Sequence, residues 1–290
     1  PQGGAMEGLA FDPVLERVYG HGKGGRIFFQ GKQEAAPWSE GQVIDLPSSL
    51  ISKLVMDIDN SAILYSIVAG RLYTGSASGS WIQQAIMVDG KDQVIHEIYQ
   101  GKKNTQTWFA FSRGDSPKLF ISTNDMASWL SIVLPAGHFS SLYQDSDQNL
   151  WLGGKDSNSD PLLYLAQNAI GNSVTWSAKG SASIQQSNTT VRSIKYVNES
   201  LYLGLADGDN ESFQASIDNY LFRSDDLGET FTALHIPATD TEVKITDGDN
   251  NHIFVVSGSY VFGSDDKGES WFDISPINNR AGDGELYISP

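Results

Sequence analysis

The chain has 290 residues, of which 40% are hydrophobic and 11% aromatic, enough for one large core. Its formal net charge of −16 argues against nucleic acid and against an anionic membrane surface, because both are bound through clustered cations. It has no cysteine, which excludes disulfides, thiol nucleophiles and cysteine-ligated metals, and no apolar run approaches the roughly 18 residues of a membrane-spanning helix.

Taken in chain order, short strand-like runs and polar turns predict six repeats of four strands each. The first strands of the repeats are expected to begin near residues 6, 53, 94, 140, 192 and 242. An aromatic residue opens the fourth strand of each repeat, at intervals of 40 to 55 residues: Trp38, Trp81, Trp129, Trp176, Phe231 and Trp271. A period near 45 residues with several short strands per repeat is typical of propeller blades, which cannot bury their faces alone.

The period predicts an all-β protein that folds as a six-bladed β-propeller of four-stranded antiparallel blades, with residues 1–290 as a single domain. Residues 284–289 are expected to form one further strand, which closes the ring against the first blade. An incomplete seventh blade is the alternative. Trp108 and Trp151 fall on second strands and are predicted to lie in the core between blades.

One eight-residue motif, S-x-D-x-G-x-[TS]-[WF], occurs twice, at residues 224–231 and 264–271, and weaker copies lie at 31–38, 74–81, 122–129 and 166–176. Its chemistry is that of a hairpin turn. The Asp carboxylate accepts bonds from N–H groups of its own turn, the hydroxyls do the same more weakly, and the Gly suits a positive φ. We predict a structural role for the residues of both motifs: Ser224, Asp226, Gly228, Thr230, Phe231, Ser264, Asp266, Gly268, Ser270 and Trp271.

The motif and its spacing resemble the Asp-box, or bacterial-neuraminidase-repeat, β-propeller superfamily. That superfamily includes sialidases, xyloglucan-cleaving glycosidases, sortilin-type receptors and photosystem II assembly factors. The resemblance covers nearly the whole chain as a repeat pattern, but only residues 224–231 and 264–271 match specifically. It implies that the boxes lie at the outer rim, away from the usual active site, so Asp226 and Asp266 are not expected to be catalytic.

The strand order places a set of basic residues at one edge of the blades, where we predict ligand binding. Its members lie between second and third strands or at the start of a blade: Arg26, Arg71, Arg113, His138 and Arg192. Arginine suits bidentate recognition of a carboxylate or phosphate. The alternative is that each arginine is a turn residue paired with a neighbouring Asp. The tripeptide at 113–115, Arg-Gly-Asp, is interpreted as a turn and not as an adhesion motif.

No metal or cofactor is predicted. Acidic groups that begin at Asp57, Asp145 and Asp247 superficially resemble a calcium loop. The last two lack its terminal Glu, and all three fall at equivalent positions of the repeats, so we interpret them as Asx turns between first and second strands. The five His residues show no spacing typical of a zinc site.

The sequence leaves two functions open. The first is a non-catalytic binding or assembly module that recognises a protein or a glycan on the central face. The alternative is a glycoside hydrolase with two facing carboxylates, drawn from Asp89, Asp92, Asp115, Asp156, Asp160, Asp207, Asp209, Glu211, Asp240 and Glu285.

Within the resemblance, sialidase activity is disfavoured because the run at 25–28, Gly-Arg-Ile-Phe, lacks the family's R-I-P-like pattern. The long connection at 205–219 could cover either kind of site. We expect a monomer with an extracytoplasmic location, no nucleic acid partner and no membrane insertion.

Overall fold

The computed structural model describes residues 6–12, 17–22, 26–31, 39–43, 51–60, 62–76, 79–114, 116–167, 169, 173–180, 183–184, 186–207, 220–237, 242–247, 252–258 and 260–275. The named elements within these residues are all strands. The described residues divide into two compact units. The first unit holds those up to Ser112 together with Lys118–Val133, and the second holds Arg113–Pro117 and those from Leu134 onward.

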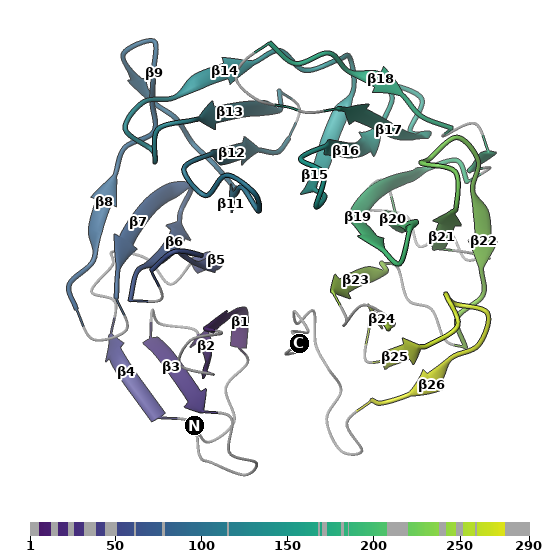
Figure 1. Cartoon of the computed structure of the whole chain (residues 1–290), viewed down its shortest axis with the longest axis horizontal. Coiled ribbons are helices and arrows are strands. Elements are labelled where there is room, and N and C mark those ends of the chain that lie inside the picture. Colours follow the sequence, from purple (N-terminus) through teal and green to yellow (C-terminus); the bar gives the residue numbers. More distant parts are fainter. Residues whose placement is uncertain are drawn as a thin grey trace. The chain divides into compact units, whose positions relative to one another are not determined.

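The first unit contains three four-stranded antiparallel sheets and a two-stranded ribbon (Figure 1). Sheet 1 consists of β1 (Met6–Asp12), β2 (Arg17–Gly22), β3 (Arg26–Gly31) and β4 (Ser39–Val43). Sheet 2 consists of β5 (Ile51–Met56), β6 (Leu64–Val68), β7 (Arg71–Gly75) and β8 (Ile82–Gln84). The ribbon pairs β9 (Met87–Val88) with β10 (Lys91–Asp92). Sheet 3 consists of β11 (Glu97–Gln100), β12 (Trp108–Ser112), β13 (Lys118–Ser122) and β14 (Leu130–Ile132).

The second unit contains three further sheets of the same kind, each with its strands in chain order. Sheet 4 consists of β15 (His138–Gln144), β16 (Leu150–Lys155), β17 (Pro161–Ala166) and β18 (Ser177–Ala178). Sheet 5 consists of β19 (Thr189–Val197), β20 (Ser200–Asp207), β21 (Leu221–Ser224) and β22 (Thr232–Leu234). Sheet 6 consists of β23 (Lys244–Asp247), β24 (Ile253–Ser257), β25 (Tyr260–Ser264) and β26 (Phe272–Asp273). The prediction of four-stranded antiparallel sheets is therefore confirmed, while ring closure and the number of blades stay predictions.

Burial changes across each sheet in a way that follows from its strand sequences. Second strands such as β6 and β20 are apolar runs buried on both faces, because a neighbouring sheet lies on each side. Trp108 and Trp151, both on second strands, are completely buried, which confirms their predicted place in the core. Fourth strands such as β8 and β14 are short and mostly exposed, which limits the unpaired edge that each sheet presents to water.

The aromatic residues that open the fourth strands are buried to different degrees. Trp129 and Phe231 are buried, whereas Trp81, Trp176 and Trp271 are half-buried. Trp38 lies outside the described residues. Two of the five described rings therefore lie in the core, and the other three lie at its edge.

Four of the six first strands, β1, β5, β15 and β19, have a β-bulge near their start. The pairing with the second strand shifts by one residue between Met6 and Gly8, and likewise at 51–53, 139–141 and 191–193. A bulge adds one unpaired residue and re-aims its side chain. Arg192 is that residue in β19, which explains why its side chain stands out from an otherwise regular strand.

The ribbon is the main difference from the prediction. The third repeat was expected to start near residue 94, but β11 begins at Glu97, and residues 87–92 form a separate hairpin before it. Asp89 and Gly90 at its tip have φ values of 51° and 73°, as a two-residue hairpin turn requires. The Asp-Gly pair between Val88 and Lys91 was a readable hairpin signal. The predicted strand at 284–289 and most of the 205–219 connection lie outside the described residues.

Candidate functional site

The turns at 224–231 and 264–271 share one hydrogen-bond network in the second unit. Asp226 accepts the Thr230 N–H on Oδ1 at 2.9 Å and the Thr230 hydroxyl on Oδ2 at 2.6 Å. The Ser224 hydroxyl donates to Asp226 Oδ1 at 2.7 Å and accepts the Gly228 N–H at 2.8 Å. The 264–271 turn repeats all four bonds with its own residues. Each carboxylate is thus fully engaged within its own turn.

These bonds stabilise the ionised carboxylates. The hydroxyls of Thr230 and Ser270, followed by the backbone N–H groups of the same residues, lower the pKa of Asp226 and Asp266 to about 2. A carboxylate that stays ionised at neutral pH and has its oxygens occupied is poorly suited to act as a general acid.

A weaker copy of the motif keeps the same network with different atoms. In the turn at 122–129, Asn124 Oδ1 accepts the Ser128 N–H at 3.0 Å, and Asn124 Nδ2 donates to the Ser128 hydroxyl at 2.9 Å. The Ser122 hydroxyl accepts the Met126 N–H at 2.9 Å. Met126 has a φ of 62° where the other two turns have glycine. The network therefore tolerates an amide in place of the carboxylate and a side chain in place of the glycine.

The stability of the protein at acid pH is expected to depend on the aspartates of these two turns. The pKa of Asp226 and Asp266 is lowered from 3.8 to about 2, so between these pH values the unfolded chain takes up protons that the folded chain does not. Their contribution to stability is complete above pH 3.8 and is lost as the pH falls through about 2. We expect the double variant Asp226→Asn/Asp266→Asn to lose melting temperature less steeply than the wild type between pH 4 and pH 2. Asn124→Asp is the matched variant and should steepen the loss, and equal slopes in all three proteins would contradict the assignment.

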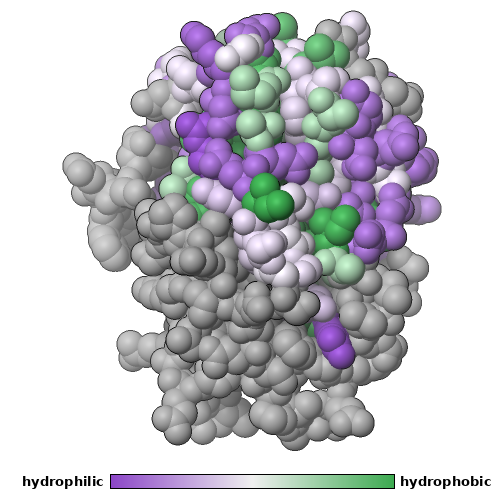
Figure 2. Space-filling model, turned by 90° about the vertical axis from the view of Figure 1, so that its left-hand side faces the viewer, coloured by the Kyte–Doolittle hydropathy of each residue, from purple (hydrophilic) through white to green (hydrophobic). Residues whose placement is uncertain are grey.

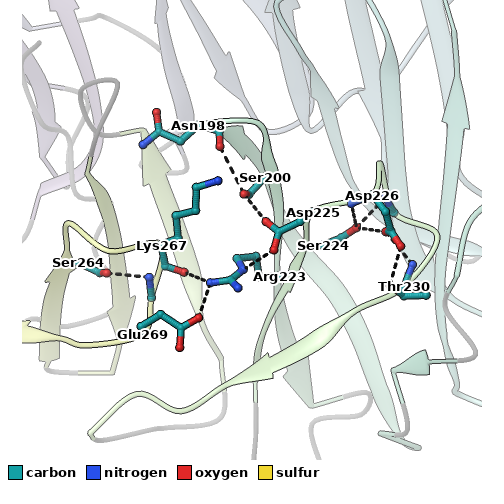
Figure 3. Close-up of polar contacts among 12 residues, drawn as sticks. Asn198, Ser200, Arg223, Ser224, Asp225, Asp226, Thr230, Ser264, Lys267 and Glu269 are labelled. Carbon is teal, nitrogen blue, oxygen red and sulfur yellow. Dashed lines mark hydrogen bonds and ion pairs between the residues drawn. The ribbon is translucent and has the colours of Figure 1, made fainter.

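Cations from the preceding sheet link successive turns, as Figure 3 shows for Arg223. Arg223 on β21 contacts Glu269 at 2.9 Å and donates to the Lys267 carbonyl at 2.8 Å, while its Nε lies 3.1 Å from Asp225. Lys179, which follows β18, contacts Glu229 of the next sheet at 2.6 Å. Both glutamates occupy the same position of the motif, so this position serves to join neighbouring sheets.

Arg71, one of the predicted ligand-binding residues, instead anchors the ribbon. Its Nη1 lies 2.7 Å from Asp92 Oδ2 and donates to the Gln93 carbonyl at 3.4 Å. Asp92 also accepts the Ile86 N–H at 3.1 Å. This arginine therefore follows the alternative interpretation, in which a turn residue pairs with an aspartate, although that aspartate belongs to the ribbon.

Arg192 is held more loosely. Its Nε lies 3.7 Å from Glu242 Oε1, beyond hydrogen-bond distance, and 36% of its side chain is exposed. Lys244 Nζ lies 3.9 Å from the other oxygen of the same glutamate. In this part of the second unit, two cations from β19 and β23 therefore share one carboxylate.

The other predicted ligand-binding residues lie at strand ends in their own sheets. His138 opens β15 and is exposed, and it pairs in register with Lys155. Arg113 follows β12 directly, in the connection to β13, where Gly114 has a φ of 115°. Arg26 opens β3, and its side chain lies outside the described part of the structure. Arg113, His138 and Arg192 therefore belong to the second unit and Arg26 and Arg71 to the first, and ligand binding by the set stays a prediction.

Three acidic groups between first and second strands were predicted to form Asx turns, and the structure shows this for the two that it describes. Asp145 Oδ1 accepts the N–H groups of Asp147 and Asn149, and its Oδ2 accepts the Asn149 amide and the Trp151 indole N–H. Asp57 likewise accepts the N–H groups of the two residues at 59–60, and Tyr65 donates its hydroxyl to Asp57 Oδ2 at 3.1 Å. The turn after Asp247 lies outside the described residues. In the part that is described, no cluster of three or more His, Asp or Glu residues could hold a metal ion.

Several carboxylates proposed for a hydrolase are engaged elsewhere. Asp156 accepts the N–H groups of Asn158 and Asp160 in its own turn, and Asp207 accepts the Tyr220 hydroxyl at 2.8 Å. Bonds within the turn lower the pKa of Asp156, the N–H of Asp160 contributing most. Five further candidates, at positions 115, 209, 211, 240 and 285, lie outside the described residues.

On the side that Figure 2 shows, the described residues form no continuous apolar face. Exposed apolar residues stand singly among polar ones there (Figure 2). The largest exposures in the first unit belong to Val133, Ile82 and Ile58, at 83%, 66% and 55%. Scattered apolar residues of this kind are normal on a protein surface. Within the described residues, no helix has the length and apolar character needed to cross a membrane.

Sequence reasoning missed the residues that join the sheets. Glu229 and Glu269 were visible as the repeated Gly-Glu letters of both motifs, so a role for this position could have been inferred. Lys179 and Arg223 carry no such signal, because their partners lie 50 and 46 residues away in the sequence.

Comparison with known proteins shows the β-propeller fold. The family model for a two component regulator propeller matches residues 133–156, which contain the first two strands of sheet 4. No relative among curated proteins matches the sequence. Solved structures resemble the chain over most of its length, at identities that support a likeness of fold alone.

Three of these structures have similar scores. Virginiamycin B lyase from Staphylococcus aureus has a TM-score of 0.66 at 14% identity, over 97% of this chain and 89% of that protein. An ancestral GH74 enzyme has a TM-score of 0.64 at 14% identity, over 94% of this chain but only 38% of the enzyme. YCF48 bound to D1 peptide has a TM-score of 0.63 at 12% identity, over 94% of this chain and 83% of that protein.

Proposed function

We propose that the protein is a non-catalytic binding or assembly module that recognises a protein or a glycan through the strand ends where Arg192 and His138 lie. The loose engagement of Arg192 carries the proposal. Its 3.7 Å contact with Glu242 and its exposed side chain leave its guanidinium able to exchange partners, whereas the 2.7 Å contact of Arg71 commits that arginine to the ribbon. Arg113, which belongs to the same unit, remains part of the proposed site through its position at the same end of its strand. Ligand binding by Arg26 stays a separate prediction.

The proposed module is a six-bladed propeller of the Asp-box type. The six four-stranded sheets and the identical turns at 224–231 and 264–271 support this description. The peptide-bound YCF48 illustrates that a protein of this fold can hold a peptide. We further propose a monomer that works outside the cytoplasm.

A glycoside hydrolase is the second candidate, favoured by the fold likeness to the GH74 enzyme. Against it stand the occupied carboxylates of Asp92, Asp156 and Asp207. A hydrolase needs two carboxyl groups about 5–10 Å apart across a sugar-sized groove.

Binding and hydrolysis can be separated by one set of assays on the purified protein. A glycan array and a panel of chromogenic glycosides come first, followed by capture of protein partners from the source cell. We expect binding without turnover, and the double variant Arg192→Gln/His138→Gln should weaken it about tenfold at an unchanged melting temperature. Lys267→Gln, a cation at the opposite strand ends, is the matched control and should bind normally. Glycoside turnover, or full binding by the double variant, would overturn the proposal.

A further inference from the structure

The ion pairs described between neighbouring parts of the chain share one polarity. In each pair the cation belongs to the earlier sheet and the carboxylate to the sheet or ribbon that follows it. The pairs are Lys53 with Glu97, Arg71 with Asp92, Lys179 with Glu229, Arg192 with Glu242, and Arg223 with Glu269. The polarity holds between sheets 2 and 3 in the first unit, and between sheets 4, 5 and 6 in the second.

The pairs between sheets lie at two levels of the strands. One level is formed by first strands, where Lys53 on β5 meets Glu97 on β11 at 3.7 Å and Arg192 on β19 meets Glu242 next to β23 at the same distance. The other level is formed by the hairpin turns, where Lys179 and Arg223 reach forward to the repeated glutamates. Sheet 5 therefore presents two cations, Arg192 and Arg223, to the sheet that follows it, and one carboxylate, Glu229, to the sheet that precedes it. We call these its forward and rear sides.

The hairpin level is the stronger of the two. The side chains of Lys179 and Arg223 are only 13% and 15% exposed, although their glutamate partners are 62% and 67% exposed. Arg223 also donates to the Lys267 carbonyl, so its position depends on the backbone of the next turn. Exposed pairs contribute little by themselves, whereas a largely buried guanidinium with several acceptors is held in one geometry.

We propose that this one-way polarity selects the order in which the sheets stack. The sheets are otherwise alike in strand order and apolar pattern, so their faces could pack in several wrong combinations. Two forward sides brought together would place cations against cations, and two rear sides would place carboxylates against carboxylates. Only a forward side against a rear side forms ion pairs, and the junction between sheets 5 and 6 satisfies this rule at both levels.

Charge reversal at Arg223 and Glu269 tests the proposal in the full chain. We expect Arg223→Glu and Glu269→Arg each to lower the melting temperature by on the order of 5 °C, and the double swap to recover at least half of the summed loss. High salt should shrink the penalties. Lys267→Glu reverses an exposed cation of the same turn whose side chain has no described partner in another sheet, and it should change the melting temperature by about 1 °C at most.

Refolding separates a selecting role from a merely stabilising one. After dilution from urea, Arg223→Glu should give at least twice the wild-type fraction of misassembled oligomers on size-exclusion chromatography, and the double swap should return to the wild-type fraction. The proposal would be overturned if the melting temperature of the double swap were no higher than that of the less stable single variant. Restored stability with an unchanged oligomer fraction in every variant would also overturn it, because the pair would then only stabilise the native stack.

Discussion

Gly204→Ala is expected to destabilise the second unit by more than about 3 kcal/mol, which is large for the addition of one methyl group. Gly204 lies on β20, at a point where the backbone of the following sheet comes close to it. A Cβ at this position would collide with the backbone carbonyl oxygen of Val243, and the Val243 N–H is itself bonded to the Leu205 carbonyl at 2.9 Å. Because the obstacle is backbone in a paired segment, the sheets would have to separate to admit the methyl group.

The measurement is urea unfolding followed by circular dichroism, with Gly90→Ala as the matched control. Gly90 has a φ of 73°, but a Cβ there meets nothing within 4 Å. Its replacement should cost only about 1 kcal/mol, the price of a left-handed conformation. Equal destabilisation by the two variants would contradict the role of Gly204 in close sheet packing.

The second large effect is expected at Trp151, which is completely buried on β16. Trp151→Ala should cost about 3–5 kcal/mol, because it leaves a cavity and also removes a hydrogen-bond donor. The indole N–H donates at 3.0 Å to Asp145 Oδ2, and Asp145 is itself only 3% exposed. The six-membered part of the ring also lies where a Cβ on Gly228 would meet it at 3.2 Å, so the side chain supports the hairpin of the next sheet.

Trp151→Phe separates the two contributions in the same unfolding assay. It keeps most of the ring volume but leaves the Asp145 carboxylate with one donor fewer, and we expect a cost of about 1–3 kcal/mol. Trp176→Ala is the control, since that ring is half-buried and should cost less than Trp151→Ala. If Trp151→Phe had the same free energy of unfolding as the wild type, the hydrogen bond to Asp145 would not contribute to stability.

The two ends of the strands in the second unit have different tasks under the proposed function. The ends with the turns at 224–231 and 264–271 are occupied by bonds within each turn and by cations from the preceding sheet. The other ends carry His138, Arg192 and Lys244, which are more exposed or more loosely paired. Structural bonds at one end leave the opposite end to vary, as in other repeat proteins that bind through a single face.

The hairpin turns and the four-strand repeat could be predicted because their causes are local. Asp226 bonds to residues within four positions of itself, so the letters of the motif contain the whole interaction. The same applies to Asp145 and its turn. The ribbon was equally local and was overlooked, since Asp89-Gly90 is a hairpin turn signal that the regular repeat obscured.

The proposed site could not be predicted to the same depth, because side-chain pairing between distant residues decides it. Arg71 and Arg192 look equivalent as sequence, yet one is held by Asp92 from an inserted ribbon and the other rests against Glu242. The sequence alone thus predicted the period of the repeat, the chemistry of the turns and the burial of the second strands. Each of these features depends on residues that lie only a few positions apart in the chain. The tertiary structure decided that Arg71 is held by an ion pair and that Arg192 can exchange partners. The physical reason is that an ion pair forms only where packing brings the two side chains together.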